Sequence, residues 1–574
     1  MTNFQDKANF IWQVADDILF GAFMHNEFRD VVLPFLVLRR LDCIFENAKP
    51  NVLKMHEEFK DKLPELEPVL LKASGGLSFF NVSPYDLKKL SQDAKNIELN
   101  FNNYLNGYSS NVREILENFQ LDKVVAKLLK NDLLFQLVDK FTEIDLHIDK
   151  VSNLEMGYIY EELLRRFNEF IGETAGHHFT PREIIRLMCN LLFAEHADDL
   201  QGEGVIRTIY DPACGTGGML TVAKEHIHQH INPSVELRMY GQELNEQTYA
   251  VAKSDFLVSG ENPENIRPES SFSKDKFRTH RFKYMLSNPP FGVSWKKEQA
   301  FIEKEANDPH GRFHAGLPRS SDGALLFLQH MISKMEASGS RIAIIFNGSP
   351  LFTGDAGGGE SNIRKWIIES DRLEAIVALP KDMFYNTGIA TYIWLVTNRK
   401  TERRKGKVQL INAVDFSTPG ASATTRKSLG SKRNYISDAQ ISQITAIYTG
   451  FAEGEYCKIF DNTDFGYTKV TVERPLLVKG KVQKDRQGNP KPDGQLRDTE
   501  KIPLKDDIDA YFKREVQPHV PDAWMEREKD KVGYEINFTK YFYKFTPLRS
   551  LEAIKADILA LEEQTEGLLK EILD

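Results

Sequence analysis

The stretch "VIRTIYDPACGTGGML", residues Val205 to Leu220, decides the fold. Its first half is rich in β-branched residues and predicts a strand, and the residues from Met219 onward predict a helix. Between them lies a loop that contains Gly215, Gly217 and Gly218. Glycines at this position let the backbone turn tightly and approach a ligand closely. A strand, a glycine loop and a helix in this order predict an α/β sheet with a ligand site at its strand ends.

The sequence on the C-terminal side of this loop continues the alternation of strands and helices. The expected strands are "LRMYGQEL", "FKYMLS", "RIAIIFNG" and "LEAIVALP", and apolar-periodic segments between them predict helices. Such alternation with short connections predicts a doubly wound, mostly parallel sheet, which we assign to residues 151–455. The segments "TYIWLVTNR" and "KVQLINA" flank the charged "KTERRKG" and predict a hairpin.

Two flanking regions complete the expected architecture. Apolar residues recur at helical spacing through residues 1–150, which predicts a helical N-terminal interaction domain. Residues 456–574 are polar and irregular, with an exposed loop rich in glycine, proline and charge, and end in an amphipathic helix, "LEAIKADILALEEQTEGLLKEILD". We expect this last helix, which forms a helical C-terminal tail, to be a docking element.

The composition is that of an ordinary globular protein: 41% of the 574 residues are hydrophobic and the net charge is −9. A protein that holds DNA alone usually has a basic surplus, so a DNA-acting chain of this charge is expected to rely on a partner. No segment has the length and apolarity of a membrane span, and the N-terminus does not resemble a signal peptide. The four cysteines form no pair motif, which favours a reducing, cytoplasmic location and argues against a metal site.

Two carboxylates at strand ends indicate the class of ligand. Asp211 precedes the glycine loop, and no Gly-Lys-Ser/Thr follows the loop, so the loop is not a phosphate loop. A carboxylate beside the glycines suits a cationic or amine group better than a pyrophosphate. Glu243 ends the second strand, where an acid can accept hydrogen bonds from ribose hydroxyls; the alternative for Glu243 is a helix cap or a surface charge. Together the two residues predict an adenosine ligand without a pyrophosphate, such as S-adenosylmethionine.

The segment "SNPPF" follows a strand that we expect to lie near the first one. By itself Asn-Pro-Pro is a turn signal. In this context the Asn288 amide oxygen and the carbonyl of Pro289 can accept hydrogen bonds from one amino group, and the Phe291 ring can stack on a planar base. These are the groups that chemistry on an exocyclic amine requires.

The combination of "DPACGTGG" with "NPPF" resembles the amino-group DNA methyltransferases of the adenine-N6 type. The segments "HHFTPREIIRLM", "NPPFGVSWK", "GLPRSSDGALLFLQHMISKM", "NGSPLFTGDAGGGESNIRKWIIE", "MFYNTGIATYIW" and "REVQPHVPDAW" resemble more closely the methylation subunit of type I restriction-modification systems. This resemblance covers nearly the whole chain.

The resemblance implies a role for each matching residue. The target adenine would be held by Asn288, Pro289, Pro290 and Phe291. S-adenosylmethionine would be bound by His177, His178, Phe179, Thr180, Pro181, Arg182, Asp211, Ala213, Cys214, Gly215, Thr216, Gly217, Gly218 and Glu243, with either Ser270 or Asp275 at its adenine amine. This chain departs from the family at His177-His178, where an acid or amide and an aromatic are common, and at Ser270, where Asp or Asn is common. Cys214 is interpreted as a small packing residue.

The resemblance also implies the partners and the reaction. Double-stranded DNA would be read by a separate specificity subunit, with a second copy of this chain and a restriction subunit as further partners, and the adenine would be flipped out of the stack before methyl transfer. Three alternatives remain at this point. They are a self-sufficient DNA methyltransferase with its own reading domain, a protein-glutamine methyltransferase, and a non-catalytic scaffold.

Overall fold

The computed structural model describes residues 2–171, 180–195, 197–384, 388–419, 434–543 and 550–561. Two compact units are present, residues 1–536 and residues 537–574. In the second unit the described residues form α21 (Phe538–Tyr541) and a helical segment over 551–561. The predicted terminal helix is therefore described only in its first part, and residues 562–574 lie outside the described residues. None of the described helices is both long enough and apolar enough to cross a membrane.

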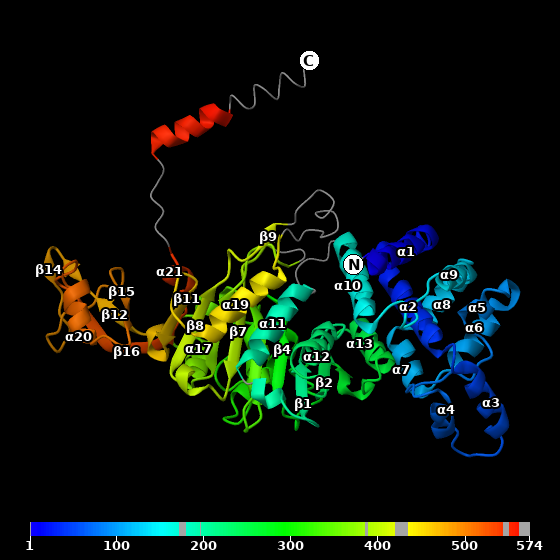
Figure 1. The fold of residues 1–574 in the computed structure, drawn as a ribbon. Helices are drawn as coiled ribbons and strands as arrows, with labels where there is room; N and C mark the ends of the chain where they lie inside the picture. Colours follow the sequence, from blue (N-terminus) through cyan, green and yellow to red (C-terminus); the bar gives the residue numbers. More distant parts are fainter. Residues whose placement is uncertain are drawn as a thin grey trace. The chain divides into compact units, whose positions relative to one another are not determined.

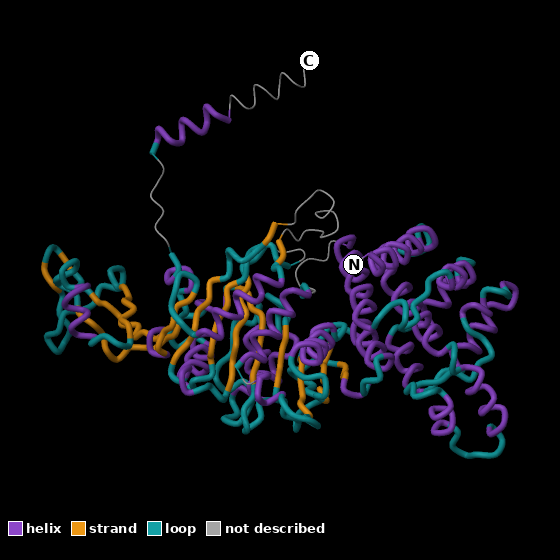
Figure 2. The backbone as a smooth tube through the Cα atoms, viewed as in Figure 1, coloured by secondary structure: helices purple, strands orange, loops and turns teal. Residues whose placement is uncertain are grey.

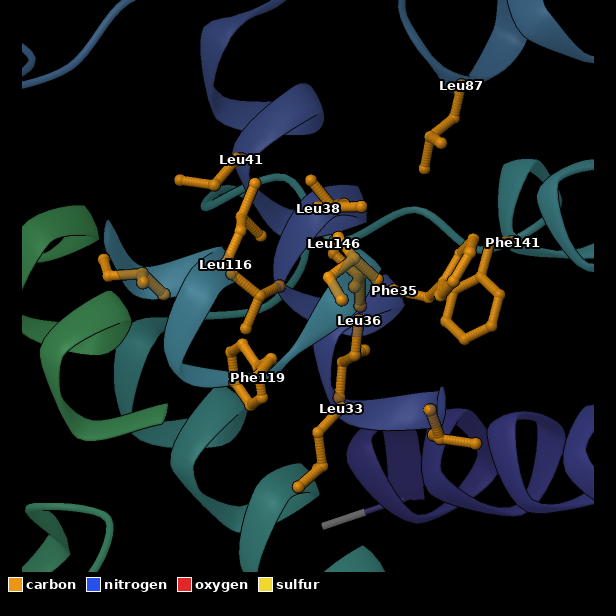
Figure 3. Packing of buried hydrophobic residues seen from close by; sticks show 14 of the residues in the cluster. Leu33, Phe35, Leu36, Leu38, Leu41, Leu87, Leu116, Phe119, Phe141 and Leu146 are labelled. Atoms are coloured by element: carbon orange, nitrogen blue, oxygen red, sulfur yellow. The ribbon is translucent and has the colours of Figure 1, made fainter. Parts of the chain in front are cut away.

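The N-terminal region is helical, as predicted, and forms its own apolar core (Figure 1). Its helices are α1 (Thr2–Leu19), α2 (Phe28–Phe45), α3 (Lys49–Phe59), α4 (Glu67–Ala73), α5 (Leu87–Leu90), α6 (Ile97–Asn106), α7 (Ser110–Asn118), α8 (Leu121–Lys130) and α9 (Leu134–Thr142). Helix α2 is the centre of this core, because nearly all of its side chains are buried. Figure 3 shows Leu33, Phe35 and Leu36 of α2 among the buried side chains of neighbouring helices.

Two buried arginines of α2 fix the connection to the central sheet. Arg39 Nε donates to the carbonyl of Ile144 at 2.7 Å, and Arg40 Nη1 donates to that of Val151 at 2.8 Å. Both guanidinium groups thus bind the segment that leads into α10 (Asn153–Ile171). Buried cations need such partners, since a buried charge without hydrogen bonds is costly.

The central sheet has nine strands in the order β11-β8-β6-β7-β5-β4-β1-β2-β3, drawn in orange in Figure 2. The strands are β1 (Ile206–Asp211), β2 (Glu236–Glu243), β3 (Ile266–Pro268), β4 (Tyr284–Ser287), β5 (Arg341–Asn347), β6 (Leu373–Ala378), β7 (Thr391–Thr397), β8 (Lys407–Asn412) and β11 (Cys457–Asp461). Strand β1 pairs in parallel with both β2 and β4. The chain therefore winds outward in both directions from β1, which confirms the predicted doubly wound α/β fold and creates a crevice at the carboxyl ends of β1 and β4.

Helices cover both faces of this sheet. They are α11 (Arg182–Ala194), α12 (Gly218–His230), α13 (Glu246–Val258), α14 (Gln299–Ala306), α15 (Ala324–Ser333), α16 (Ser349–Phe352), α17 (Gly359–Glu369) and α19 (Asp438–Gly450). Ile209 of β1 packs in the core formed with α11 and α12, whereas the hydroxyl of its neighbour Tyr210 lies 3.1 Å from Nε2 of His330 on α15. Since successive residues of a strand point to opposite faces, α12 and α15 lie on opposite sides of the sheet.

The predicted hairpin of the "TYIWLVTNR" and "KVQLINA" segments is wrong. Strand β7 inserts between β5 and β6 and runs antiparallel to both, while β8 pairs with β6 in parallel and with β11. All seven residues of β7 except Tyr392 are buried. Both faces of this strand are apolar, and a position in the interior of the sheet keeps both away from water. A charged loop between two strands predicts a reversal of direction but not which strands become neighbours.

The region after residue 455 is more regular than expected. Strands β12 (Gly466–Glu473), β15 (Asp498–Pro503) and β16 (Trp524–Tyr534) form an antiparallel sheet in the order β15-β12-β16. A further short pair in this region is β13 (Leu477–Val478) with β14 (Lys481–Val482), and α20 (Ile508–Tyr511) follows β15. Before residue 455, β9 (Thr418–Pro419) pairs with β10 (Asn434–Tyr435). The division of the chain at residues 150 and 455 stays a prediction.

Helix α13 joins the N-terminal helices to the sheet. Its Ala250, Val251 and Leu257 belong to the core of the N-terminal helices, whereas Ala252 and Phe256 belong to the core of the sheet. A helix buried on all sides belongs in the interior of a large protein. Because α13 follows directly from the end of β2, the N-terminal helices are held close to the crevice.

Candidate active site

A cavity of about 620 Å³ lies at the carboxyl ends of β1, β2 and β4. Such a volume is typical of sites for small molecules and cofactors. Of the predicted site residues, Thr180, Asp211, Ala213, Cys214, Gly215, Thr216, Gly218, Glu243, Ser270, Asn288, Pro289 and Pro290 line it. His177, His178 and Phe179 lie outside the described residues. The structure thus brings together residues that are separated by up to about a hundred positions in the chain.

The glycine loop connects β1 to α12 and forms one wall of the cavity. Gly215 and Gly217 have φ angles of +56° and +82°, a backbone region that residues other than glycine rarely adopt. At Gly218 a Cβ atom would meet the carboxylate of Glu161 on α10 and the guanidinium of Arg182. Glycine is therefore favoured at positions 215 and 217 by the backbone turn, and at position 218 by the close packing beneath the loop.

Glu243 holds the glycine loop in place. Its Oε2 accepts a hydrogen bond from the Gly215 N–H at 2.9 Å, and its Oε1 accepts one from the Asn245 N–H at 2.8 Å. A carboxylate oxygen can accept more than one hydrogen bond, so these contacts are compatible with a ligand in the cavity. Glu243 thus lines the cavity and also accepts a hydrogen bond at the start of α13.

Asp211 is buried between the two motifs that the sequence singled out. Its Oδ1 accepts hydrogen bonds from the Ala213 N–H at 3.0 Å and from the Ser287 hydroxyl at 2.7 Å. Its Oδ2 is buried and has no hydrogen-bond partner within the described part of the chain. Burial, together with the negative charge of Glu243, raises the pKa of Asp211 to about 7, although both hydrogen bonds oppose the shift. A cationic or amine ligand at Oδ2 would offset this cost.

The segment after β4 enters the cavity with its amide and both prolines. Asn288 Nδ2 donates to Oγ1 of Thr180 at 2.9 Å, which fixes the orientation of the amide. Phe291 does not line the cavity. Its ring is only 6% exposed and belongs to the core around α11 and α12. The sequence pattern could not separate a ring that faces a ligand from one that faces the core.

Arg182 supports the site from behind rather than lining the cavity. Its Nε and Nη2 donate to the two carboxylate oxygens of Glu161 at 3.1 and 2.7 Å, and its Nη1 donates to the carbonyl of Gly218 at 3.2 Å. Pro181 occupies the N-cap position of α11. The "TPR" segment thus connects α10, α11 and the glycine loop.

The alternatives Ser270 and Asp275 occupy different positions. Ser270 lines the cavity next to Ser271 and Phe272. Asp275 does not line it, and its carboxylate forms an ion pair with the buried Lys334. Cys214 packs against Gly241, where a Cβ atom would meet its sulfur at 2.7 Å, and burial raises the pKa of the thiol well above its usual range.

Several lining residues were missed by the sequence analysis. The most unexpected is Arg29 of α2, since it comes from the N-terminal helices. Its Nε is buried without a hydrogen-bond partner among the described residues and lies 3.7 Å from Oδ1 of Asp30. The described lining contains five carboxylates and two cations; these charged residues are Glu161, Asp211, Glu243, Glu269, Glu298, Arg29 and Lys297. No local pattern marks Arg29, because only the packing of α2 on α13 brings it to the cavity.

Comparison with known proteins agrees with this geometry. Residues 152–473 match the family model described as N-6 DNA methylase, and residues 7–141 match the HsdM N-terminal domain. The chain belongs to the N-6 DNA methylase family. It is 27% identical over 491 residues to the methylase subunit of the type I restriction enzyme MjaIX of Methanocaldococcus jannaschii, covering 83% of this chain and 82% of that one.

Two further comparisons extend this result. The chain is 31% identical over 274 residues to the EcoEI methylase subunit of Escherichia coli, covering 46% of this chain and half of that one. The crystal structure of a type I methyltransferase subunit from Streptococcus thermophilus has the same fold, with a TM-score of 0.62 and 20% identity, over 81% of this chain and 97% of that one. The family resemblance seen in the motifs is thereby confirmed, and the chain is a DNA methyltransferase subunit of the type I kind.

The raised pKa of Asp211 predicts how stability depends on pH. An unfolded Asp loses its proton near pH 4, whereas folded Asp211 keeps it up to about pH 7. Stability that is present below pH 4 is therefore lost as the pH rises to 7. Asp211→Asn does not titrate, so its melting temperature should rise relative to wild type between about pH 5 and pH 7 and then level off.

Thermal melts of both proteins across this pH range measure the difference. Asp308→Asn is the matched control, because Asp308 is exposed and its replacement should leave no such trend. A difference for Asp211→Asn that does not change with pH would contradict the prediction.

Proposed function

We propose that this chain transfers the methyl group of S-adenosylmethionine to the N6 amino group of an adenine in DNA, with the site chosen by a partner subunit. The observation that carries the proposal is the hydrogen bond between Ser287 and Asp211, which joins the glycine loop to the Asn288 segment in one cavity. A cofactor site and an amine-binding site side by side are what methyl transfer to an amine needs.

The lining of the cavity suits the proposed cofactor. When bound, S-adenosylmethionine supplies an electrophilic methyl group on a sulfonium, and its charges are those of one sulfonium, one ammonium and one carboxylate. The acidic lining favours the two positive groups, and Asp211 Oδ2 offers a buried acceptor. Glu243 would accept hydrogen bonds from the ribose hydroxyls, and Ser270, which lines the cavity, is preferred over Asp275 at the adenine amine.

Arg29 would hold the carboxylate of the cofactor. It is one of two cations in the described lining, and the other, Lys297, belongs to the segment of Val293–Glu298 that follows the amine-binding prolines. A guanidinium with a buried, unsatisfied N–H gains a charge-assisted hydrogen bond when a carboxylate arrives. The N-terminal helices would in this way take part in cofactor binding.

Asn288 and Pro289 would orient the target amine. The amide oxygen of Asn288 and the carbonyl of Pro289 accept its two N–H groups, which directs the nitrogen lone pair away from the ring and toward the methyl group. The nitrogen would gain the methyl group as the bond between the methyl carbon and sulfur breaks with its electron pair left on sulfur, and it would then lose one proton to water. No covalent protein intermediate is required, because a sulfonium is already a good leaving group. Orientation and placed acceptors supply most of the rate gain in such a step. Phe291 could stack on the base only after the turn at Gly292 moves its buried ring.

The target adenine would leave the DNA stack to reach the cavity, because its amino group is inaccessible in a duplex. The partner proposed for sequence recognition is a specificity subunit, together with a second copy of this chain and, in a restricting complex, a nuclease subunit. The relatives are methylase subunits of type I restriction enzymes, which supports this arrangement. Purification with the products of neighbouring genes, followed by methyl transfer to plasmid DNA, tests it. Sequence-specific methylation by the isolated chain would instead support a self-sufficient enzyme.

Removal of Glu243 should weaken cofactor binding through the ribose. Calorimetry should show that Glu243→Ala binds S-adenosylmethionine at least roughly tenfold more weakly, since hydrogen bonds to a charged group contribute about 1.5–3 kcal/mol each. Glu243 also holds the Gly215 N–H, so loss of affinity alone does not prove a ribose contact. A 2′-deoxy analogue of the cofactor separates the two effects: wild type should bind it more weakly than S-adenosylmethionine, and Glu243→Ala should not distinguish them. Equal discrimination by both proteins would rule out the ribose contact.

Removal of Asn288 should abolish methyl transfer while cofactor binding is retained. Loss of a single placed polar group costs roughly 10² to 10³ in rate at comparable sites. Asn288→Ala should therefore be folded, bind S-adenosylmethionine and be nearly inactive, whereas Asn288→Asp should keep some activity because a carboxylate oxygen still accepts the N–H. Melting temperature, cofactor affinity and methyl transfer are measured on the same preparations. If Asn288→Ala methylates DNA at the wild-type rate, the segment is only a turn.

Removal of the Arg29 charge should weaken binding of the cofactor but not of a ligand without its carboxylate. Arg29→Gln is expected to raise the Kd for S-adenosylmethionine roughly tenfold, because one lost charge-assisted hydrogen bond is about 1.5–3 kcal/mol. Binding of 5′-methylthioadenosine, which lacks the amino-acid part, should not change. Arg113→Gln is the control, since Arg113 is an exposed arginine of the same helical region. An equal loss of affinity for both ligands would show that Arg29 supports the folded structure and does not contact the carboxylate.

A further inference from the structure

A small ribbon of residues 474–497 extends from the end of β12. Backbone hydrogen bonds of 2.8 Å connect its three short segments to one another, from Gln483 N to Leu476 O, from Lys491 N to Gln483 O and from Leu476 N to Lys491 O. The turn between β13 and β14 has positive φ at both Lys479 (+51°) and Gly480 (+78°), as the tight turns that match the twist of two-stranded hairpins do. The backbone thus fixes the shape of this ribbon, which we call the basic ribbon.

The charge of the basic ribbon is opposite to that of the chain. Residues 474–497 include seven basic and two acidic residues, a net charge of +5, whereas the whole chain carries −9. The two carboxylates serve the turns: Asp485 Oδ1 accepts the Gln487 and Asn489 N–H groups at 2.9 Å, and Asp493 Oδ1 accepts the Gln495 N–H at 2.9 Å. Neither carboxylate lies within ion-pair distance of a ribbon lysine or arginine in the described structure.

Five cations of the basic ribbon point into solvent. Two arginines of the ribbon form ion pairs, Arg474 with Asp522 at 3.0 Å and Arg497 with Glu473 at 2.8 Å. The remaining basic residues are exposed, and within the described residues none of them lies within 4.0 Å of a carboxylate; they are Lys479, Lys481, Lys484, Arg486 and Lys491. By contrast, Lys501 and Lys505 on the neighbouring strand and loop pair with Glu535 and Asp461. Five exposed cations without a carboxylate partner among the described residues thus lie close together in the chain, between residues 479 and 491.

We propose that the basic ribbon binds the phosphate backbone of duplex DNA outside the target base. The proposal rests on the proposed function only in taking DNA as the substrate. Lysine and arginine contacts to phosphates supply most sequence-independent affinity for DNA. A narrow β-ribbon is also one of the two shapes that a DNA groove admits. The ribbon thus provides part of the grip that the acidic composition of the chain otherwise lacks.

The strand order sets how far from the target base this contact falls. Five strand-to-strand steps separate β4, which carries the Asn288 segment, from the edge strand β11 that precedes β12. At about 4.8 Å per step this is roughly 24 Å of sheet, which corresponds to about seven base pairs at 3.4 Å each. The ribbon would therefore contact DNA that flanks the target by at least about this length.

The same ribbon exposes several apolar side chains, so the alternative to DNA is a protein partner that binds this surface. Leu477, Val478, Val482 and Leu496 are 53, 48, 44 and 43% exposed. Isolated exposed apolar residues of this kind are common on protein surfaces. The unpaired charge is the more unusual feature, so we favour DNA and treat a protein partner as an outcome of the test.

The test reverses three charges on the ribbon. The variant Lys479→Glu, Lys481→Glu, Arg486→Glu is compared with Lys54→Glu, Lys72→Glu, Lys95→Glu, which changes the net charge equally at exposed lysines of the N-terminal helices. The full chain, purified with its co-expressed partners, is titrated with a long duplex and with a duplex trimmed to about five base pairs on either side of the target. The Kd is measured over a range of salt concentrations, and melting temperature and subunit composition are recorded for each protein.

The ribbon variant should bind the long duplex at least roughly tenfold more weakly than wild type, with a salt slope reduced by about two to three, because each lost phosphate contact lowers the slope by about 0.9. The control variant and the trimmed duplex should show no such difference. If the ribbon variant binds the long duplex as tightly as wild type does, the proposal is wrong. If that variant also loses a partner subunit, the ribbon binds protein instead. Methyl transfer by wild type is measured in parallel, so a failure of the proposed function is seen separately from a failure of the ribbon.

Discussion

The hydrogen bond from the Ser287 hydroxyl to the carboxylate of Asp211 is the contact on which the site depends. It connects the ends of β4 and β1, which are neighbours only because the sheet winds outward in both directions from β1. Ser287 is fully buried and Asp211 is nearly so, hence loss of either group would leave a polar atom without a partner in the interior. The glycine loop and the Asn288 segment are therefore placed relative to each other by the strand ends themselves and not by flexible loops.

The parts of the fold and site that the sequence predicted are those encoded by local patterns. Alternating strands and helices predicted the doubly wound sheet, and the glycine loop, Glu243 and Asn288 could each be assigned because a strand end fixes where its next residue lies. The neighbours of β7 could not be predicted, since pairing depends on which buried edge is available and not on the loop that follows. The choice between Ser270 and Asp275 was open because it depends on a tertiary contact and not on a local pattern. Only the folded chain shows that Lys334 binds Asp275 away from the cavity.

Arg29 shows a different limit of sequence reasoning. Nothing around this residue differs from an ordinary helix start. Its position at the cavity follows from α13, which packs against the N-terminal helices on one side and the sheet on the other. Gln247 at the start of α13 donates to Asp30, the neighbour of Arg29, at 2.6 Å. The helical region thus contributes to the wall of the cavity, and its packing on α13 places Arg29 there.

The distribution of charge resolves an apparent conflict between the two ligands proposed for this protein. A cavity with five carboxylates suits a ligand that carries two positive groups, but it repels a polyanion. Exposed charges influence one another over about 8 Å at physiological ionic strength, whereas roughly 24 Å of sheet separates the Asn288 segment from the edge strand next to the basic ribbon. The acidic cavity therefore does not cancel the attraction of DNA to the ribbon. A chain with a net charge of −9 can accordingly keep an acidic catalytic site and still contribute to holding DNA, provided that its cations lie away from that site.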